Sequence, residues 1–293
     1  MKASAFAYAR ATSVDNALQL LVAHGQAAKV LAGGQSLMPA MNLRLISPDV
    51  VIDIGGLVEL KGIAVRGDVL RIGALTRHAD LLRSPETVTH APLLVAAAAH
   101  VAHPAIRNRG TIGGSLAHAD PAAELPACML ALDATIVARG SRGERRIAAA
   151  DFFTGIFETA LMADELLVAI ELPIPRKNSA HYFHEFARRH GDYAIAGLAV
   201  QAVVESGSLA DLRLAYFAIG DRPGLANAAR KLVNVTVTPT LVHQISTAFA
   251  AEELDPHEDQ QASSAMRRHL AGVLFRRAIA ALLDRPELAG AVA

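Results

Sequence analysis

The stretch AGGQSLMPAMNLRL, residues 32–45, follows the short apolar run KVL at residues 29–31. Gly33 and Gly34 lack a Cβ, so the backbone there can adopt positive φ and bring its N–H groups close to a ligand. Consecutive N–H groups in such a turn form an anion-binding concavity, and the Ser36 hydroxyl adds a donor. The pattern indicates a strand entering a phosphate-binding turn, although an ordinary strand-to-loop turn has the same composition.

A second glycine segment, RGTIGGSLAHADP at residues 109–121, has similar chemistry. Thr111, Gly113, Gly114 and Ser115 again place glycine N–H groups beside hydroxyls. A helix is expected at residues 121–132 with Pro121 as its first residue, where a missing N–H costs little. Two such turns suit a diphosphate approached from both sides, and two unrelated bends are the alternative.

Two known nucleotide motifs do not fit the first turn. A Walker A loop needs a lysine after its last glycine, but Gly34 is followed by Gln35. A dinucleotide-binding G-x-G-x-x-G must open a long helix, whereas Pro39 and the strand-like MNLRLI at residues 41–46 come next. The sequence therefore argues against a Rossmann nucleotide site.

The hydrophobic periodicity divides the chain into three units, at residues 1–60, 61–176 and 177–293. The polar segment IPRKNSA at residues 174–180 separates the last two. Strands are expected at residues 29–34, 49–56, 62–65, 69–75, 134–140, 165–173, 181–189, 194–205 and 211–220, and helices at 14–22, 77–83, 92–101 and 263–283. This order predicts an α+β protein.

Composition narrows the function classes. The 293 residues are 52% hydrophobic and carry 28 basic and 28 acidic side chains, so neither a nucleic-acid surface nor an anionic membrane surface is favoured. No apolar run reaches the roughly eighteen residues of a membrane span. Cys128 is the only cysteine, which excludes an intrachain disulfide and a four-cysteine iron–sulfur cluster. A cytoplasmic protein is expected.

Three segments together carry a family resemblance: KVLAGGQSLMPAMNLRL at residues 29–45, HPAIRNRGTIGGSLAHADPAAELPA at 103–127 and RRHGDYAIAG at 188–197. The chain resembles the FAD-binding medium subunit of the molybdenum hydroxylases, known from carbon monoxide dehydrogenase and related to the flavin domain of xanthine dehydrogenase. The order and spacing of the expected elements match along essentially all of the chain.

The resemblance implies a fold and a role. The fold is the FAD-binding PCMH or vanillyl-alcohol oxidase type, with FAD between two α/β subdomains, plus a C-terminal domain with a three-stranded antiparallel sheet and helices. The role is that of an oxidoreductase subunit, passing electrons from [2Fe-2S] clusters of a small subunit through non-covalent FAD to an acceptor. Molybdopterin would lie on a large subunit, in a heterotrimer or its dimer.

The resemblance also implies cofactor-binding positions but no catalytic side chain and no metal ligand on this chain. Ala32, Gly33, Gly34, Gln35, Ser36 and Leu37 match the first pyrophosphate loop, Lys29 and Leu31 the strand before it, and Thr111, Gly113, Gly114 and Ser115 the second loop. Val101 and Ala102 match the chain that passes the flavin, Glu124 an acid near the ribityl or ribose hydroxyls, Leu167 an adenine contact, and His184 and Tyr193 positions near the flavin.

Three positions depart from the family pattern. Gln35 stands where carbon monoxide dehydrogenase-like chains often have histidine, and His184 stands where the xanthine dehydrogenase domain has lysine. His103 replaces a small or acidic residue and has no assigned role. Flavin electronics or the choice of acceptor could therefore differ from those relatives.

Several other polar residues and Cys128 allow more than one interpretation from the sequence. Arg107 and Arg109 either neutralise phosphate or are solvated or face a partner subunit. His100, His103, His118 and Asp120 could be drawn as a metal site, but Pro104 ends the helix that would hold the first two. Ser36 and Ser115 lie outside any G-x-S-x-G elbow, so hydrolase chemistry is disfavoured. Cys128 is expected to be a buried small hydrophobic residue.

Two rival functions stay open at the level of sequence. One is a free-standing flavin oxidase of the vanillyl-alcohol oxidase type, which often attaches FAD covalently through histidine. The other is a non-catalytic nucleotide-binding partner protein that has kept the fold and lost electron transfer.

Overall fold

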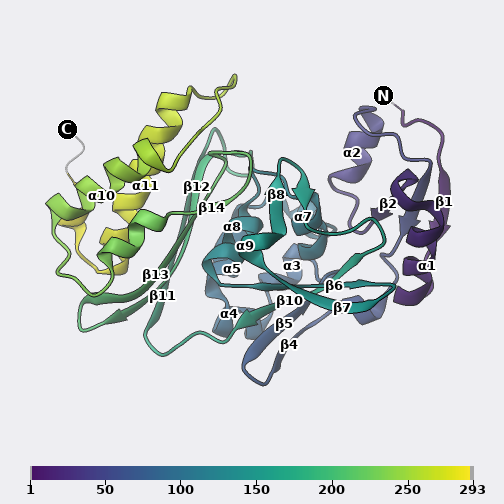
Figure 1. The fold of residues 1–293 in the computed structure, drawn as a ribbon, viewed down its shortest axis with the longest axis horizontal. Helices are drawn as coiled ribbons and strands as arrows, with labels where there is room; N and C mark the ends of the chain where they lie inside the picture. The colour runs from purple at the N-terminus through teal and green to yellow at the C-terminus, as the bar shows by residue number, and fades with distance from the viewer. Residues whose placement is uncertain (1, 291–293) are drawn as a thin grey trace.

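Three sheets follow one another along the molecule, from the N-terminus at one end to the C-terminus at the other (Figure 1). The computed structural model describes residues 2–290. The sheets share three hydrophobic cores, since strands of the central sheet also enter the N-terminal core and strands of the C-terminal sheet also enter the central core. The fold is of the expected α+β class, with helices packed between and beside the sheets.

The N-terminal sheet is parallel and has the strand order β1 (Ala7–Arg10), β3 (Val50–Asp53), β2 (Ala28–Leu31). The helix α1 (Val14–His24) follows β1, as the apolar spacing predicts, and buries Val14, Ala17, Leu18 and Leu21. Ser13 begins this helix, because its Oγ accepts a hydrogen bond from the Asn16 N–H at 3.0 Å. The 3₁₀ turns η1 (Gly25–Ala27) and η2 (Val58–Leu60) complete this part.

The central sheet is antiparallel throughout, in the order β4 (Ile63–Arg66), β5 (Val69–Gly73), β10 (Leu166–Pro173), β6 (Thr135–Gly140), β7 (Gly143–Ala148). Short helices cover it: α3 (His78–Leu81), α4 (Pro85–His90), α5 (Pro92–His100), α6 (Pro104–Arg107), α7 (Ile112–His118), α8 (Glu124–Ala131) and α9 (Ala149–Phe152). The small ribbon of β8 (Phe153–Gly155) and β9 (Glu158–Thr159) lies beside α7.

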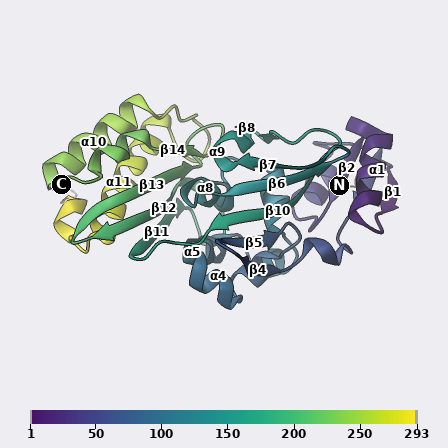
Figure 2. The ribbon, with the colours of Figure 1, turned by 60° about the horizontal axis from the view of Figure 1, so that its bottom comes forward.

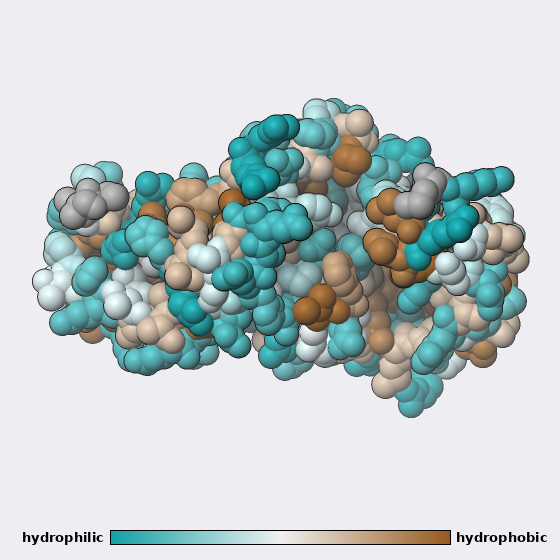
Figure 3. Space-filling view, turned by 90° about the horizontal axis from the view of Figure 1, so that it is seen from above, coloured by the Kyte–Doolittle hydropathy of each residue, from teal (hydrophilic) through white to brown (hydrophobic). Residues whose placement is uncertain are grey.

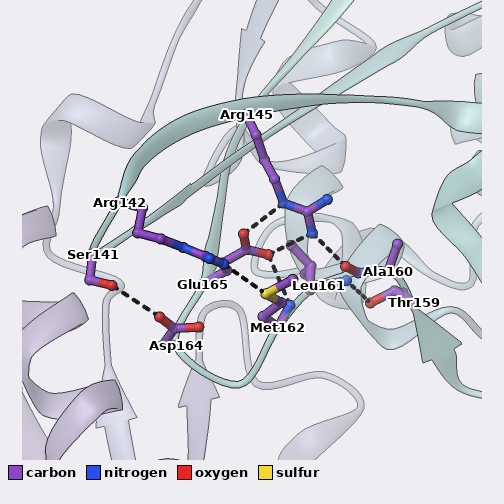
Figure 4. Close-up of polar contacts among 9 residues, drawn as sticks. All are labelled: Ser141, Arg142, Arg145, Thr159, Ala160, Leu161, Met162, Asp164 and Glu165. Atoms are coloured by element: carbon purple, nitrogen blue, oxygen red, sulfur yellow. Dashed lines mark hydrogen bonds and ion pairs between the residues drawn. The ribbon is translucent and has the colours of Figure 1, made fainter.

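An ion pair fastens the segment that leads from β9 into β10 (Figure 4). Arg145 donates to both carboxylate oxygens of Glu165, at 2.7 and 2.8 Å, and to the Ala160 carbonyl oxygen at 2.6 Å. Glu165 in turn accepts a hydrogen bond from the Met162 N–H at 2.9 Å. The guanidinium thereby lowers the pKa of Glu165 and fixes the start of β10 against β7.

The C-terminal sheet consists of β11 (Ser179–Ala187), β12 (Ala194–Glu205), β13 (Ser208–Phe217) and the two-residue β14 (Gly224–Leu225), all antiparallel. The resemblance implied three strands, and β14 is the addition. The 3₁₀ turn η3 (Asn227–Leu232), the helices α10 (Pro239–Glu252) and α11 (Ser264–Leu282) and the turn η4 (Pro286–Ala289) follow.

Both faces of β12 are buried, which explains its almost continuous apolar sequence (Figure 2). Leu198 and Val200 pack toward α10 and α11, whereas Ala199 packs into the central core with α5 and α8. Within residues 2–290 no helix is long and apolar enough to cross a membrane.

Three local expectations are wrong. Residues 41–46, expected to be strand-like, form no strand. Met41 and Asn42 belong instead to the helix α2 (Leu37–Asn42), where Pro39 is tolerated because the first helical turn needs no N–H donor. The helix α8 begins at Glu124 and not at Pro121. Residues 112–118, expected as a second loop, form the helix α7.

Candidate functional site

The first glycine turn presents a row of free backbone donors. Within residues 2–290, the N–H groups of residues 33–37 donate to no protein oxygen. Gly34 has φ of +71°, a conformation that glycine adopts without strain. The Gln35 side chain folds back, its Nε2 donating to the Gly33 carbonyl oxygen at 3.0 Å. Because exposed consecutive N–H groups attract anions, this turn is a preformed anion cradle.

The second glycine segment lies directly against the first. A Cβ placed on Gly33 would come within 2.3 Å of the Arg109 carbonyl oxygen, so only glycine fits there. A Cβ on Gly114 would lie 3.8 Å from the Ala32 Cβ. The two segments, about eighty residues apart in sequence, therefore meet at one place, as a two-sided site requires.

The second segment uses its backbone differently from the expected loop. Gly113 N–H donates to the Ala74 carbonyl oxygen at 2.9 Å, and Gly114 N–H donates to Thr111 Oγ1 at 3.2 Å. Ser115 N–H donates to the Thr111 carbonyl oxygen at 3.0 Å. Thr111 is thus the N-cap of α7, and the glycines allow close packing rather than positive φ.

Arg107, one of the two candidate phosphate ligands, forms hydrogen bonds with the protein backbone. Its Nη1 donates to the carbonyl oxygens of Val101 and Ala102 at 2.9 and 3.0 Å. The guanidinium therefore satisfies acceptors at the end of α5 and stabilises Ala102 at φ of +41°. Arg109 is exposed beside the first turn and stays a candidate for phosphate neutralisation.

The chain segment at Val101 and Ala102 meets the turn between β11 and β12. A Cβ on Gly191 would lie 2.8 Å from the Ala102 carbonyl oxygen and 3.0 Å from the His103 ring. The next residue but one, Tyr193, is 63% exposed. It lines a cavity of about 360 Å³ together with Asp120 and Phe157.

Hydrophobic residues gather on the side of the molecule where α2, α7 and β8 lie (Figure 3). Ile156 and Phe157, in the turn between β8 and β9, are 50% and 53% exposed, as is Leu43 at 53%. The cavity beside Tyr193 does not include the glycine turn. An elongated ligand held at both places would have to run between them.

His100 and Glu185 pair where α5 and β11 pack together, and Glu124 begins α8, which also packs against α5. His100 Nδ1 lies 3.3 Å from Glu185 Oε1, and this hydrogen bond raises the pKa of His100. Burial raises the pKa of Glu124 to about 8, with further contributions from the charges of Glu185 and Asp120. Burial of Glu124 therefore favours the neutral form of its carboxyl group.

The remaining predicted positions are distributed unevenly. Leu31, Ser36 and Leu37 are half-buried around the first turn and Ser115 is half-buried near the second, while Lys29 is exposed. Leu167 is 4% exposed inside the central core, so it has little side chain left to meet a ligand. His184 packs with Phe186 on the face of β11 opposite to Glu185, and the structure does not bring it to the other positions.

Sequence reasoning missed Glu185 and the role of Arg107. Glu185 was detectable as a lone acid in the otherwise apolar and aromatic strand HYFHEFA. Arg107 carried no such signal, because a cap on a preceding helix depends on tertiary contacts.

Cys128 is fully buried, as expected, and burial raises the pKa of its thiol well above the usual value. The histidine set considered for metal does not assemble: in residues 2–290 no three histidine, cysteine or carboxylate side chains are grouped to hold a metal ion. His118 packs instead on the Phe157 ring, 4.9 Å between centroids.

These features define an α+β protein with unpaired backbone N–H groups at one glycine turn and a separate cavity at Tyr193, a combination that suits a flavin nucleotide. Residues 4–175 match the family model described as the FAD binding domain in molybdopterin dehydrogenase, and residues 181–282 match the CO dehydrogenase flavoprotein C-terminal domain. The chain belongs to this family of FAD-binding medium subunits of molybdenum hydroxylases.

Individual relatives agree with the family assignment. The 6-hydroxypseudooxynicotine dehydrogenase complex subunit alpha of Paenarthrobacter nicotinovorans is 40% identical over 97% of both chains. The nicotine 6-hydroxylase medium subunit of the same organism is 39% identical over 95% of this chain and 98% of its own. A solved structure of carbon monoxide dehydrogenase from Hydrogenophaga pseudoflava superposes with a TM-score of 0.94 at 36% identity, covering 97% of this chain and 99% of that one.

The chain is accordingly an oxidoreductase subunit that binds FAD, and the molybdopterin and iron–sulfur cofactors of such enzymes belong to other subunits. The residues present fit this cofactor. The unpaired N–H groups of residues 33–37 are donors of the kind that a diphosphate accepts.

Proposed function

We propose that the first glycine turn, residues 33–37, holds the FAD diphosphate and that the second segment supports it from behind. The free N–H row carries this proposal. Gly114 lies beside Ala32 where the two segments meet, and Ser115 is assigned to the cradle with them. Val101, Ala102 and Tyr193 border the isoalloxazine, and Glu124 faces the sugar hydroxyls.

The bound flavin supplies one- and two-electron transfer, and this chain's residues bind and orient it. The cradle fixes the diphosphate, while the turn at Ala102, held by Arg107, sets the position of the flavin end. Tyr193 and Phe157, which line one cavity, would cover that end of the flavin. No side chain of residues 2–290 is assigned a bond-breaking role.

We further propose a cytoplasmic heterotrimer, alone or as its dimer, in which a small subunit carries two [2Fe-2S] clusters and a large subunit carries molybdopterin. The single cysteine supports this division, because one thiolate cannot supply the four that hold a [2Fe-2S] cluster. Substrate choice, whether an N-heterocycle, a purine, carbon monoxide or an aldehyde, is assigned to the large subunit. The names of the two nicotine-related relatives favour an N-heterocycle.

An absorption spectrum of the purified chain after FAD addition tests the proposal. We expect a flavin band that trichloroacetic acid releases into the supernatant. Flavin that stays with the precipitate would instead support the covalent oxidase, and no flavin band at all would overturn both flavin functions.

A pair of variants tests the cradle itself. Gly34→Val places a branched side chain where φ is +71°, and should abolish FAD binding. Gly114→Val places a Cβ 2.8 Å from Thr111 Oγ1 and should weaken binding by disturbing the start of α7. If both variants bind FAD like the parent chain, the two-segment cradle is wrong.

A further inference from the structure

The three strands of the N-terminal sheet end side by side next to the first glycine turn. In the parallel register, Asp53 of β3 lies between Arg10 of β1 and Leu31 of β2, at the last paired position of each strand. The Ile54 N–H, one residue further, donates to the Leu31 carbonyl oxygen at 3.0 Å. Ligands of open parallel sheets bind beyond the carboxyl ends of the strands, so Asp53 stands at an edge that suits ligand binding.

Two uncharged donors hold the Asp53 carboxylate in place. The Tyr8 hydroxyl donates to Asp53 Oδ2 at 2.6 Å, and the Gly55 N–H donates to Oδ1 at 2.8 Å. A carboxylate has about four acceptor sites on its two oxygens, so each oxygen can take a further donor. The side chain is therefore fixed in position and still able to accept hydrogen bonds.

Only a small gap separates this carboxylate from the cradle. A Cβ on Gly55 would lie 3.1 Å from Asp53 Oδ1 and 3.6 Å from the carbonyl oxygen of Ala32, the residue before Gly33. A carboxylate this close to a diphosphate repels it. Hydroxyl groups of the same ligand offset the repulsion when they donate to the carboxylate, because hydrogen bonds to an ionised acceptor are among the stronger ones.

The direction of the cofactor decides which hydroxyls reach this edge. Ala102 and Tyr193, the positions proposed for the flavin, lie where the central part meets the C-terminal sheet, whereas Asp53 lies in the sheet at the opposite end of the molecule (Figure 1). With the diphosphate at the first glycine turn, the adenosine half of FAD extends toward the N-terminal sheet. Its ribose carries two neighbouring hydroxyls, which suit a single carboxylate.

We propose that Asp53 accepts hydrogen bonds from the ribose hydroxyls of the adenosine half of FAD, and that Tyr8 is the positioning residue that fixes the carboxylate. This inference rests on the proposed function, because the donors belong to FAD. Dinucleotide-binding folds place an acid about 20 residues beyond their glycines, where it binds a ribose hydroxyl. Asp53 has a similar spacing from the first turn and ends the neighbouring strand, although that turn opens no long helix.

The experiment compares FAD with its 2′,3′-dideoxyadenosine analogue, which lacks only the two ribose hydroxyls. Each ligand is titrated into the flavin-free full chain and followed by flavin fluorescence. We expect the parent chain to bind FAD about 10- to 100-fold more tightly than the analogue, the range for hydrogen bonds to a charged group. The analogue keeps the ribityl hydroxyls, so the comparison reports on the adenosine end alone.

Asp53→Asn removes the charge with little change of shape. It should bind FAD more weakly than the parent chain does, and should bind FAD and the analogue almost equally. Tyr8→Phe removes the hydroxyl that holds Oδ2, so it should reduce the preference for FAD in part. Asp68→Asn, the same change at an exposed position between β4 and β5, is the matched control and should leave both affinities unchanged.

The preference between the two ligands separates binding from a structural role, because a disturbed fold weakens both ligands by the same factor. An Asp53→Asn variant that keeps the full preference for FAD overturns the inference, as does a parent chain that binds both ligands equally. Either result leaves the proposed function standing. An absence of FAD binding by the parent chain overturns the proposed function as well.

Discussion

At Gly33 the backbone N–H has no acceptor within residues 2–290, whereas at Gly113 it donates to the Ala74 carbonyl oxygen at 2.9 Å. The two glycine pairs have similar sequence neighbours, with a serine shortly after each. The N–H groups of the first pair are free to bind a ligand, whereas those of the second pair form hydrogen bonds within the protein. What distinguishes a binding turn from a supporting one is therefore the use of its N–H groups rather than its composition.

Among the alanine substitutions, Gly33→Ala disturbs the contact between the two segments and should have the largest effect. The new Cβ would meet the Arg109 carbonyl oxygen at 2.3 Å, and backbone cannot move aside as a side chain can. We expect a loss of about 3 kcal/mol in the free energy of unfolding and of FAD affinity on the order of 100-fold. Thermal denaturation and FAD titration measure the two effects.

Gly224→Ala is the matched control for that change, because a Cβ there meets nothing within 4 Å. It should alter stability by no more than about 0.5 kcal/mol. Equal losses in both variants would show that the contact between the segments is unimportant.

Lowering the pH should reduce the stability of the fold where His78 packs against the second segment. The ring of His78 packs against Gly110, and burial lowers its pKa from 6.5 to about 4. The unfolded chain then binds a proton that the folded chain rejects, so stability falls as pH drops from 6.5 toward 4, by roughly 3 kcal/mol from this group.

Urea denaturation at several pH values, compared with His78→Leu, checks this expectation. The variant should lose most of the difference in stability between neutral pH and pH about 4 that His78 contributes. A variant with the same acid sensitivity as the parent chain would assign that sensitivity elsewhere.

Gly113→Ala tests the role of the second glycine segment, which supports the first. Its Cβ would lie 2.6 Å from the Ala74 Cβ and 2.7 Å from the Ala74 carbonyl oxygen, so α7 must move away from the residues after β5. We expect a cost of roughly 2 kcal/mol in stability. FAD affinity, measured well below the melting temperature, should fall far less than in Gly33→Ala, and an equal fall would contradict the division of roles.

Thr111→Ala should have the smallest effect. It removes the side chain that accepts the Gly114 N–H at 3.2 Å and begins α7, a cap worth about 1 kcal/mol. The freed Gly114 N–H could then serve the ligand, so FAD affinity should be retained. Denaturation midpoints and FAD titrations, measured side by side, test this separation of stability from binding.

The sequence predicted the α+β class and elements such as α1, whose apolar spacing is regular. It failed at short elements, where tertiary contacts outweigh local preference. The glycines of α7 are poor helix formers, and the helix exists because Gly113 fits against Ala74. The first turn was recognisable because positive φ at Gly34 is a local property, whereas the cap by Arg107 and the pairing of Glu185 with His100 join distant residues.

The C-terminal sheet packs against other elements on both of its faces, and this limits which relatives of the chain can exchange their C-terminal parts. The polar segment at residues 174–180 looks like a seam, yet Arg213 of β13 donates to the Leu130 carbonyl oxygen at the end of α8 at 3.1 and 3.0 Å, and Phe217 joins the central core. A transplanted C-terminal third would have to match the surface of α8 as well as its own helices. Recombination between relatives at this seam should therefore succeed only when both pieces descend from closely similar parents.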